Sequence, residues 1–267
     1  MPDLTQIRAL IIDLDGVLWR GDTPLPGLQQ FFGLLRRRHL PFLLASNNST
    51  TSPETAQAKL RRMGVEVAIP EILTSPEATA TYLLERFARG ARLYAIGEEP
   101  LRSALQHAGF DLQDRADAVE AVVAGLDRKV TWDQLTEATL AIRAGALFVG
   151  TNPDVTLPTE RGLGPGAGAL LAALEAATGT QPVIVGKPEP HMYIQSLEHL
   201  HTAPQSTLAL GDRIETDILG GKRAGVLTAL VLTGVTQRRD LERSAIQPDW
   251  VFEDLPELCR ALEGQAD

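Results

Sequence analysis

Short apolar runs alternate with amphipathic helical patterns along almost the whole chain of 267 residues. The runs are too short to form helices and are rich in Ile, Leu and Val, which is typical of buried strands. Strands that alternate with helices in this way are typical of parallel βα units. The sequence therefore predicts an α/β fold built on a parallel sheet.

The first and last parts of the chain supply one set of these elements. We expect strands over residues 9–12, 41–45, 72–74, 183–185, 207–210, 227–232 and 250–252. We expect helices over residues 27–38, 53–63, 75–88 and 191–201, and another that ends near residue 224. The tripeptide Ser-Pro-Glu opens two of them, with Ser52 and Ser75 as the expected N-caps and a proline at the first helical position.

A middle block, residues 91–179, has a βαβ pattern of its own. We expect its strands over residues 93–96, 119–124 and 146–149, and its helices over residues 99–108, 132–144 and 167–177. Residues 150–166 form a loop without periodicity that contains three prolines and four glycines. A loop of this length in a compact domain is usually functional, and the alternative is a plain surface connection.

Two carboxylates stand where the first apolar run ends. Asp13 and Asp15 follow residues 9–12, and Gly16 then breaks the strand. Acids two positions apart repel each other unless a cation or a phosphate site uses them. One carboxylate can attack phosphorus, and the second can exchange a proton with the leaving group and with water. The alternative is that both acids are solvated loop residues.

Polar residues also follow three other predicted strands. They are Ser46, Asn47 and Asn48, then Lys187, and then Asp212 with Asp217 five positions later. In an open parallel sheet, ligands bind outside the carboxyl ends of the strands, so these groups would meet at one edge. Hydroxyl and amide groups with a lysine suit phosphate oxygens, whereas Asp13 and Asp212 suit Mg²⁺. Taken singly, each residue has a plainer role as a cap, a turn residue or a surface charge.

Charge and cysteine content restrict the partners and the compartment. The net charge is −9, which argues against binding to nucleic acid polymers. The single cysteine, Cys259, cannot form a disulfide within the chain, which fits a reducing cytoplasm. The sequence shows neither a signal-peptide pattern nor an apolar run of membrane-spanning length, so we expect no membrane association.

Four short motifs together resemble those of the haloacid dehalogenase-like superfamily of phosphohydrolases. DLDGV is similar to the first motif, LLAS to the second, Lys187 within VGKPEP to the third and GDRIETD to the fourth. The longer strings GVLWRGDTPLPG, SNNST, FVGTNPDVTLPTERGLGPGAG and GDRIETDILGGKRAG resemble the branch that carries a type II cap. That branch contains 4-nitrophenyl phosphatases, phosphoglycolate and pyridoxal phosphate phosphatases, and nucleotide or sugar phosphatases.

The resemblance implies a Rossmann-like parallel sheet core, residues 1–80 and 183–267, and an inserted α/β cap domain, residues 81–182. It makes Asp13 the nucleophile and Asp15 the general acid and base. It also implies Mg²⁺ held by Asp13, the backbone carbonyl of Asp15 and Asp212, with support from Asp217 for the metal or for the lysine. The residues implied in phosphate binding are Ser46, Asn47, Asn48 and Lys187. Relatives often pair through their caps, which implies a homodimer.

These observations predict a Mg²⁺-dependent phosphomonoesterase that acts on a small phosphorylated metabolite. A phosphotransferase or mutase that uses the same aspartyl phosphate, and a non-catalytic metabolite-binding protein, are the alternatives. Asn152 and Asp154 of the long loop are candidates for substrate contact, or they bond only their own loop backbone in an Asx-turn. Some relatives present a histidine where this chain has Leu157, which argues against a pyridoxal phosphate-type specificity.

Overall fold

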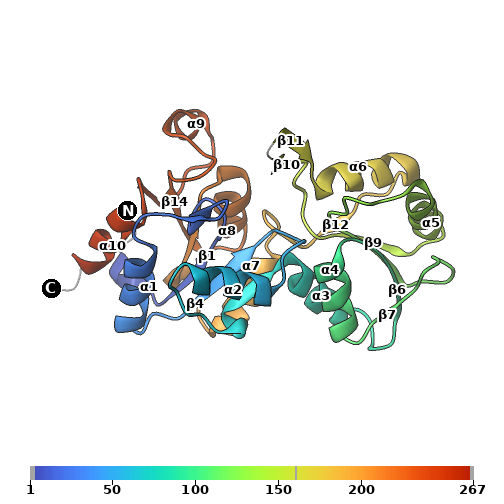
Figure 1. Cartoon of the computed structure of the whole chain (residues 1–267), viewed down its shortest axis with the longest axis horizontal. Coiled ribbons are helices and arrows are strands. Elements are labelled where there is room, and N and C mark those ends of the chain that lie inside the picture. The colour runs from blue at the N-terminus through green and yellow to red at the C-terminus, as the bar shows by residue number, and fades with distance from the viewer. Residues whose placement is uncertain (1–3, 160, 265–267) are drawn as a thin grey trace. The chain divides into compact units, whose positions relative to one another are not determined.

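The computed structural model describes residues 4–159 and 161–264, and the chain divides into two compact units. The core unit consists of Met1–Ser46, Pro53–Leu73 and Pro188–Asp267, and the insert unit consists of Asn47–Ser52 and Thr74–Lys187. Each unit contains a sheet of parallel strands together with helices, so the predicted α/β fold is confirmed (Figure 1). The domain boundaries after residues 80 and 182 stay predictions.

The core unit is built on a sheet with the strand order β15-β14-β13-β1-β4-β5. Its strands are β1 (Ala9–Ile12), β4 (Phe42–Ser46), β5 (Ile72–Thr74), β13 (Thr207–Gly211), β14 (Leu227–Val231) and β15 (Trp250–Phe252). Strand β1 pairs in parallel with β13 and β4, and Ile12 lies opposite Leu210 and Leu44. Every residue of β1 is buried, as expected for a strand covered on both faces.

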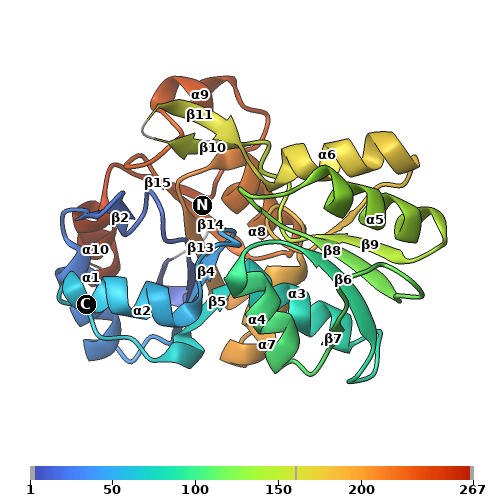
Figure 2. The ribbon, with the colours of Figure 1, turned by 45° about the vertical axis from the view of Figure 1, so that its right-hand side comes forward.

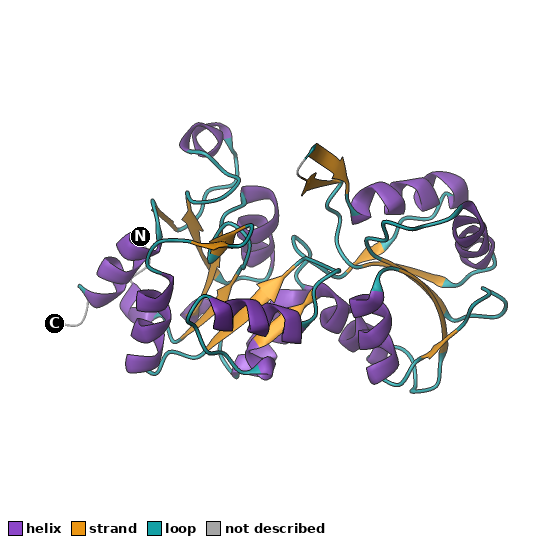
Figure 3. Cartoon of the chain, in the orientation of Figure 1, coloured by secondary structure: helices purple, strands orange, loops and turns teal. Residues whose placement is uncertain are grey.

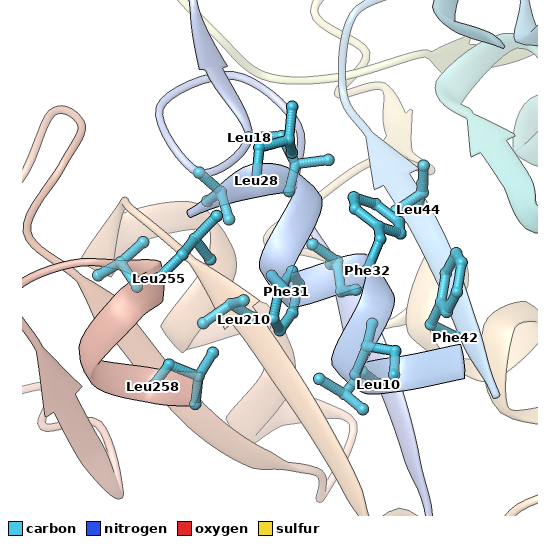
Figure 4. Packing of buried hydrophobic residues seen from close by; sticks show 14 of the residues in the cluster. Leu10, Leu18, Leu28, Phe31, Phe32, Phe42, Leu44, Leu210, Leu255 and Leu258 are labelled. Carbon is cyan, nitrogen blue, oxygen red and sulfur yellow. The ribbon is translucent and has the colours of Figure 1, made fainter. Parts of the chain in front are cut away.

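Helices cover the core sheet because alternate side chains of each strand point to opposite faces. These helices are α1 (Leu28–Arg37), α2 (Pro53–Arg62), α7 (His191–Leu200), α8 (Leu219–Arg223), α9 (Arg238–Arg243) and α10 (Leu255–Glu263). Leu10 and Leu210 belong to one apolar cluster with Phe31 of α1 and Leu258 of α10 (Figure 4). Burial stabilises the fold by about 1.5–3 kcal/mol for each such side chain. Helix α7 contacts β1 and β4, and α8 contacts β14.

The insert unit has a second parallel sheet with the strand order β12-β9-β8-β6-β7. Its strands are β6 (Arg92–Ile96), β7 (Asp111–Leu112), β8 (Ala121–Ala124), β9 (Leu147–Gly150) and β12 (Val183–Ile184). Its helices are α3 (Ser75–Leu84), α4 (Glu99–His107), α5 (Trp132–Arg143) and α6 (Ala167–Thr178) (Figure 2). Tyr94, Val122 and Phe148 share an apolar cluster with residues of α5 and α6. The insert unit therefore has a core of its own.

Two short hairpins lie outside these sheets (Figure 3). One pairs β2 (Trp19–Arg20) with β3 (Thr23–Pro24), and the other pairs β10 (Thr156–Thr159) with β11 (Gly162–Pro165). The prediction that residues 150–166 form a loop without periodicity was therefore wrong for its second half. A proline in each strand and two glycines in β11 conceal the alternating pattern there, although an antiparallel ribbon with few neighbours tolerates them.

Two features of α3 differ from the prediction. Its N-cap position is occupied by Thr74 rather than Ser75, whose hydroxyl group donates a hydrogen bond of 2.7 Å to the backbone oxygen of Asn47. The regular helix ends at Leu84, although the amide of Phe87 still donates to the oxygen of Leu83. The last turn thus continues in irregular form toward the predicted end at residue 88.

Among residues 4–159 and 161–264, the longest helices are α5 and α6, with 12 residues each. No helix within these two stretches has both the length and the apolar composition that crossing a bilayer requires.

Candidate active site

Two aspartates leave the sheet of the core unit side by side. Asp13 directly follows β1, and its amide donates a hydrogen bond of 2.8 Å to the oxygen of Leu210, which prolongs the pairing of β1 with β13. Asp212 directly follows β13. Both side chains therefore lie at the carboxyl edge of the sheet, where open α/β folds bind their ligands.

A third carboxylate joins them from a turn of π-helix, Ile214–Ile218, that precedes α8. Asp13, Asp212 and Asp217 each offer an oxygen atom that lies within 4.8 Å of the others. The last two side chains are only 1% and 3% exposed. Backbone amides orient them, because Val235 donates to Asp212 Oδ2 at 2.6 Å and Arg213 donates to Asp217 Oδ2 at 3.1 Å. Isolated π-helical turns are frequent at functional sites.

Glycines leave the room that these carboxylates occupy. A Cβ atom at Gly211 would collide with the side chain of Asp217, and one at Gly234 would collide with the carboxylate of Asp212. Gly16 approaches Asp212 in the same way and has a φ of +84°, a left-handed conformation that glycine adopts without strain. The backbone thus closes around Asp212 from two sides.

The donor set of this carboxylate cluster fits a hard divalent cation. Three carboxylates this close together, two of them buried, repel one another unless a positive charge lies between them. They supply only oxygen ligands, as Mg²⁺ and Ca²⁺ prefer. The structure thus brings the predicted ligands Asp13 and Asp212 together with the predicted supporting residue Asp217. The role assigned to the backbone carbonyl of Asp15 stays a prediction.

The side chain of Asp15 has a different environment. It is exposed, and its Oδ1 accepts a hydrogen bond of 2.7 Å from the indole Nε1 of Trp19. Ser46, the predicted hydroxyl donor, is the last residue of β4 and is 4% exposed. It therefore lies at the end of the strand next to β1.

The remaining predicted site residues belong to the insert unit, where Asn47 and Lys187 contact each other. The amide of Lys187 donates to Asn47 Oδ1 at 2.8 Å, and Asn47 Nδ2 donates to the backbone oxygen of Lys187 at 2.8 Å. The Asn47 side chain thus pairs with this backbone as a neighbouring strand would. The Lys187 side chain is 2% exposed. The phosphate-binding roles of both residues stay predictions.

Asn152 and Asp154 of the long loop also contact Asn47. Asn152 Nδ2 donates to the backbone oxygen of Asn47 at 2.9 Å, and Asn47 Nδ2 lies 3.4 Å from Asp154 Oδ2. The amide of Asp154 donates to Asn152 Oδ1 at 3.1 Å, which is the Asx contact that the alternative interpretation expects. Asn48 makes a similar local contact, accepting from the amide of Thr50 at 2.9 Å. Whether these three residues also bind substrate stays a prediction.

The residue motifs contain Gly16, Trp19 and Gly211 but gave no sign of their contacts with the aspartates, and Gly234 lies outside the motifs. A tryptophan four positions after an acid could have suggested a contact, because the intervening Gly16 permits a tight turn. No sequence signal links Gly234 with Asp212, since their proximity depends on the pairing of β13 with β14.

Comparisons with known proteins identify the family of the chain. A haloacid dehalogenase-like hydrolase model matches residues 10–111, and a HAD-hydrolase-like model matches residues 184–258. The acid sugar phosphatase of Staphylococcus saprophyticus is 40% identical over 256 residues, which cover 96% of this chain and 98% of that protein. The acid sugar phosphatase of Staphylococcus aureus is 39% identical, covering 97% of this chain and 100% of that protein.

Solved structures show the same likeness. The 4-nitrophenylphosphatase of Thermotoga maritima matches with a TM-score of 0.92 and 36% identity over 97% of this chain and 98% of that chain. A glycerol phosphate phosphatase of Mycobacterium tuberculosis, solved in complex with magnesium, matches with a TM-score of 0.89 and 36% identity. That match covers 97% of this chain and 79% of the mycobacterial chain.

The structure combines an α/β fold with a carboxylate cluster that could hold a metal ion at the edge of its sheet, and the chain belongs to the haloacid dehalogenase-like hydrolases. Within that family it is a phosphatase that hydrolyses phosphate monoesters, with an α/β cap inserted into its core. The predicted family and class of enzyme are therefore confirmed.

Proposed function

We propose that the protein is a Mg²⁺-dependent phosphomonoesterase that works through an aspartyl phosphate on Asp13. The observation that carries the proposal is the meeting of Asp13, Asp212 and Asp217 within 4.8 Å at the end of the central strands. The oxygen ligands suit Mg²⁺, and the mycobacterial relative was solved with that metal. When bound, Mg²⁺ would offset the negative charge of the phosphate and of the carboxylates.

The residues of the chain divide the reaction between them. In the first step a carboxylate oxygen of Asp13 forms a bond to phosphorus, while the bond from phosphorus to the leaving oxygen breaks and Asp15 gives that oxygen a proton. In the second step water attacks the same phosphorus, Asp15 takes back a proton, and the bond to Asp13 breaks. Ser46, Asn47, Asn48 and Lys187 would bind the phosphoryl oxygens. The side chain of Asn47 would also hold the backbone of Lys187 in place.

The substrate that we propose is a small phosphorylated metabolite. The names of two relatives, acid sugar phosphatase and glycerol phosphate phosphatase, support sugar phosphates and glycerol phosphates as the first candidates. The cap would supply the contacts that distinguish one leaving group from another, because the phosphate end is common to all candidates.

The test is the Asp13→Asn variant, assayed with 4-nitrophenyl phosphate and Mg²⁺. The amide has the same shape as the carboxylate but is a poor nucleophile at phosphorus, so we expect kcat to fall at least roughly a thousandfold with the fold retained. Residual turnover above that level, in protein shown by mass spectrometry to be free of deamidated or wild-type chain, would falsify the covalent mechanism.

A second measurement separates hydrolysis from phosphotransfer. Wild-type protein is assayed with 4-nitrophenyl phosphate in the presence of an excess of a sugar acceptor. Free phosphate released in equal amount to nitrophenolate supports a hydrolase, whereas a large deficit of free phosphate would identify a phosphotransferase.

A further inference from the structure

The indole of Trp19 holds one oxygen of the Asp15 carboxylate. The hydrogen bond from Nε1 to Oδ1 is 2.7 Å long, which is short for a nitrogen donor and typical of a charged acceptor. The indole is 2% exposed, whereas Asp15 is exposed. A buried donor therefore restrains the rotation of an exposed carboxyl group.

The backbone around Trp19 is fixed from several directions within the core unit. The amide of Gly16 donates to the oxygen of Trp19 at 2.8 Å and closes the turn between the acid and the indole. Arg20, the next residue of β2, donates to the backbone oxygen of Thr233 at 2.6 Å. The hydroxyl group of Thr233 in turn donates to the oxygen of Gly16 at 2.6 Å. The segment after β14 thus holds both ends of the turn.

A lysine covers the indole. Lys59 Nζ of α2 lies 4.5 Å from the centre of the Trp19 ring, within the range of a cation–π interaction. The same ammonium group lies 3.7 Å from Asp22 in the connection between β2 and β3. These contacts restrict the tilt of the ring and so the direction in which its N–H group points.

We propose that Trp19 is a positioning residue for the acid and base step of Asp15, an inference that rests on the proposed function. The indole N–H group is a neutral donor, and Oδ1 can accept its hydrogen bond whether the carboxyl group is protonated or ionised. In a protonated carboxyl group the carbonyl oxygen is the better acceptor, so this hydrogen bond favours Oδ1 as the carbonyl oxygen and Oδ2 as the oxygen that carries the proton. Fixing Oδ1 restricts the position from which Oδ2 gives the proton to the leaving oxygen and later takes one from water.

The experiment compares wild-type protein with Trp19→Phe in single turnovers over a series of aryl and alkyl phosphates with Mg²⁺. Nitrophenolate leaves with little protonation, whereas an alkoxide requires an acid. We expect the rate of cleavage of an alkyl phosphate to fall at least roughly tenfold, and that of 4-nitrophenyl phosphate to change less than about threefold. The rate would thus depend more steeply on the leaving group. Equal losses across the series would overturn the proposal, because a merely structural defect acts on all substrates alike.

Two further variants keep the test decisive. Trp250→Phe changes another buried tryptophan of the core unit, on β15, and should leave the dependence on the leaving group unchanged. If Trp19→Phe does not fold, incorporation of benzothienylalanine at position 19 retains the ring shape and replaces only the N–H group with sulfur. The steeper dependence must then appear with this residue, and its absence would overturn the proposal.

The Asp15→Asn variant separates this inference from the proposed function. Asp15→Asn without any selective loss on alkyl phosphates would refute the acid role of Asp15 itself, and the role of Trp19 with it. If Asp15→Asn shows the selective loss and Trp19→Phe does not, only the positioning role fails. If both show it, adding Trp19→Phe to Asp15→Asn should cause no further selective loss.

Discussion

Polar side chains have opposite roles in the carboxylate cluster of the core unit and in the amide network of the insert unit. This network consists of the side chains of Asn47 and Asn152 and the backbone atoms that they contact. In the cluster, Asp13, Asp212 and Asp217 turn their oxygens toward one another, and the backbone serves only to orient them. In the network, the side chains of Asn47 and Asn152 contact backbone atoms. Side chains that face one another with like charge create a binding site, whereas side chains that satisfy backbone atoms fix the path of the chain.

Among substitutions that keep all three carboxylates of the cluster, the largest effect should come from crowding them. In Gly234→Ala, the new methyl group would collide with the carboxylate of Asp212. We expect the Mg²⁺ concentration needed for half-maximal activity to rise roughly 10- to 100-fold, as for other changes that displace a ligand. The control is Gly33→Ala on α1, where the added methyl meets only the end of the Arg37 side chain at 3.4 Å. An unchanged Mg²⁺ requirement in Gly234→Ala would mean that the cluster tolerates displacement.

Asn47→Ala tests whether the network matters to chemistry through Lys187. The substitution removes both hydrogen bonds between the Asn47 side chain and the backbone of Lys187. We expect kcat/KM to fall about tenfold, and by the same factor for 4-nitrophenyl and alkyl phosphates, because phosphate is common to both. Ser75→Ala, which removes one bond to the backbone oxygen of Asn47, is the matched control and should have a smaller effect. Loss on the alkyl substrate alone would contradict this expectation.

Replacing both Asn152 and Asp154 with alanine would sharpen the comparison. Two roles are possible, holding the loop or binding the leaving group, and each predicts a different result. If they only hold the loop, the free energy of unfolding falls by about 1–2 kcal/mol for the lost hydrogen bonds, and activity changes in parallel on all substrates. If they bind the leaving group, kcat/KM for the preferred metabolite falls at least roughly tenfold more than for 4-nitrophenyl phosphate. The contacts of both side chains with Asn47 lead us to expect the first result.

The smallest effect concerns an ion pair of the core unit away from the cluster. Arg36 donates two hydrogen bonds to Glu71, at 2.6 and 2.7 Å, and the amide of Ala68 donates a third. Burial alone would raise the pKa of Glu71, but these bonds and the charge of Arg36 outweigh it and lower the pKa below its ordinary value. Since half of the Arg36 side chain is exposed, we expect Glu71→Gln to cost only about 0.5–1 kcal/mol at neutral pH.

The direction of this pKa shift determines its pH dependence. Because the folded pKa of Glu71 is lowered, its contribution to stability is present above its ordinary pKa and is lost as the pH falls through the lower folded value. Urea unfolding at neutral and acidic pH should therefore show the two proteins converging in acid. A difference between wild type and Glu71→Gln that stays constant with pH would show that the pair contributes nothing through its charge.

Much of the fold could be predicted because strand periodicity is a local property. The predicted strand over residues 9–12 coincides with β1, and that over residues 207–210 lies within β13. Asp13 and Asp212 directly follow these two strands in the sequence. The rule that parallel strands end at one edge then predicted that the two aspartates would meet there. The hairpin of β10 and β11 was missed because its strands contain proline and glycine.

The partners of individual side chains could not be predicted. Asn47 contacts a backbone 140 positions away, and nothing in the residues between them indicates which atoms its amide meets. The same holds for the approach of Gly234 to Asp212, which depends on packing. Trp19 and Asp15 are only four positions apart, but the same sequence would also fit a turn in which the Trp19 side chain points away from Asp15.

The pairing of β1 with β13 also determines the order in which the protein can take shape on a ribosome. Ala9 lies opposite Thr207, so the central pair of the core sheet joins residues that are about 200 positions apart in the sequence. A ribosome that has reached residue 187 has synthesised every strand of the insert unit, but only half of the core sheet, β1, β4 and β5. The edge of β1 that pairs with β13 must wait for the last third of the chain, and during synthesis it is an apolar strand edge exposed to aggregation.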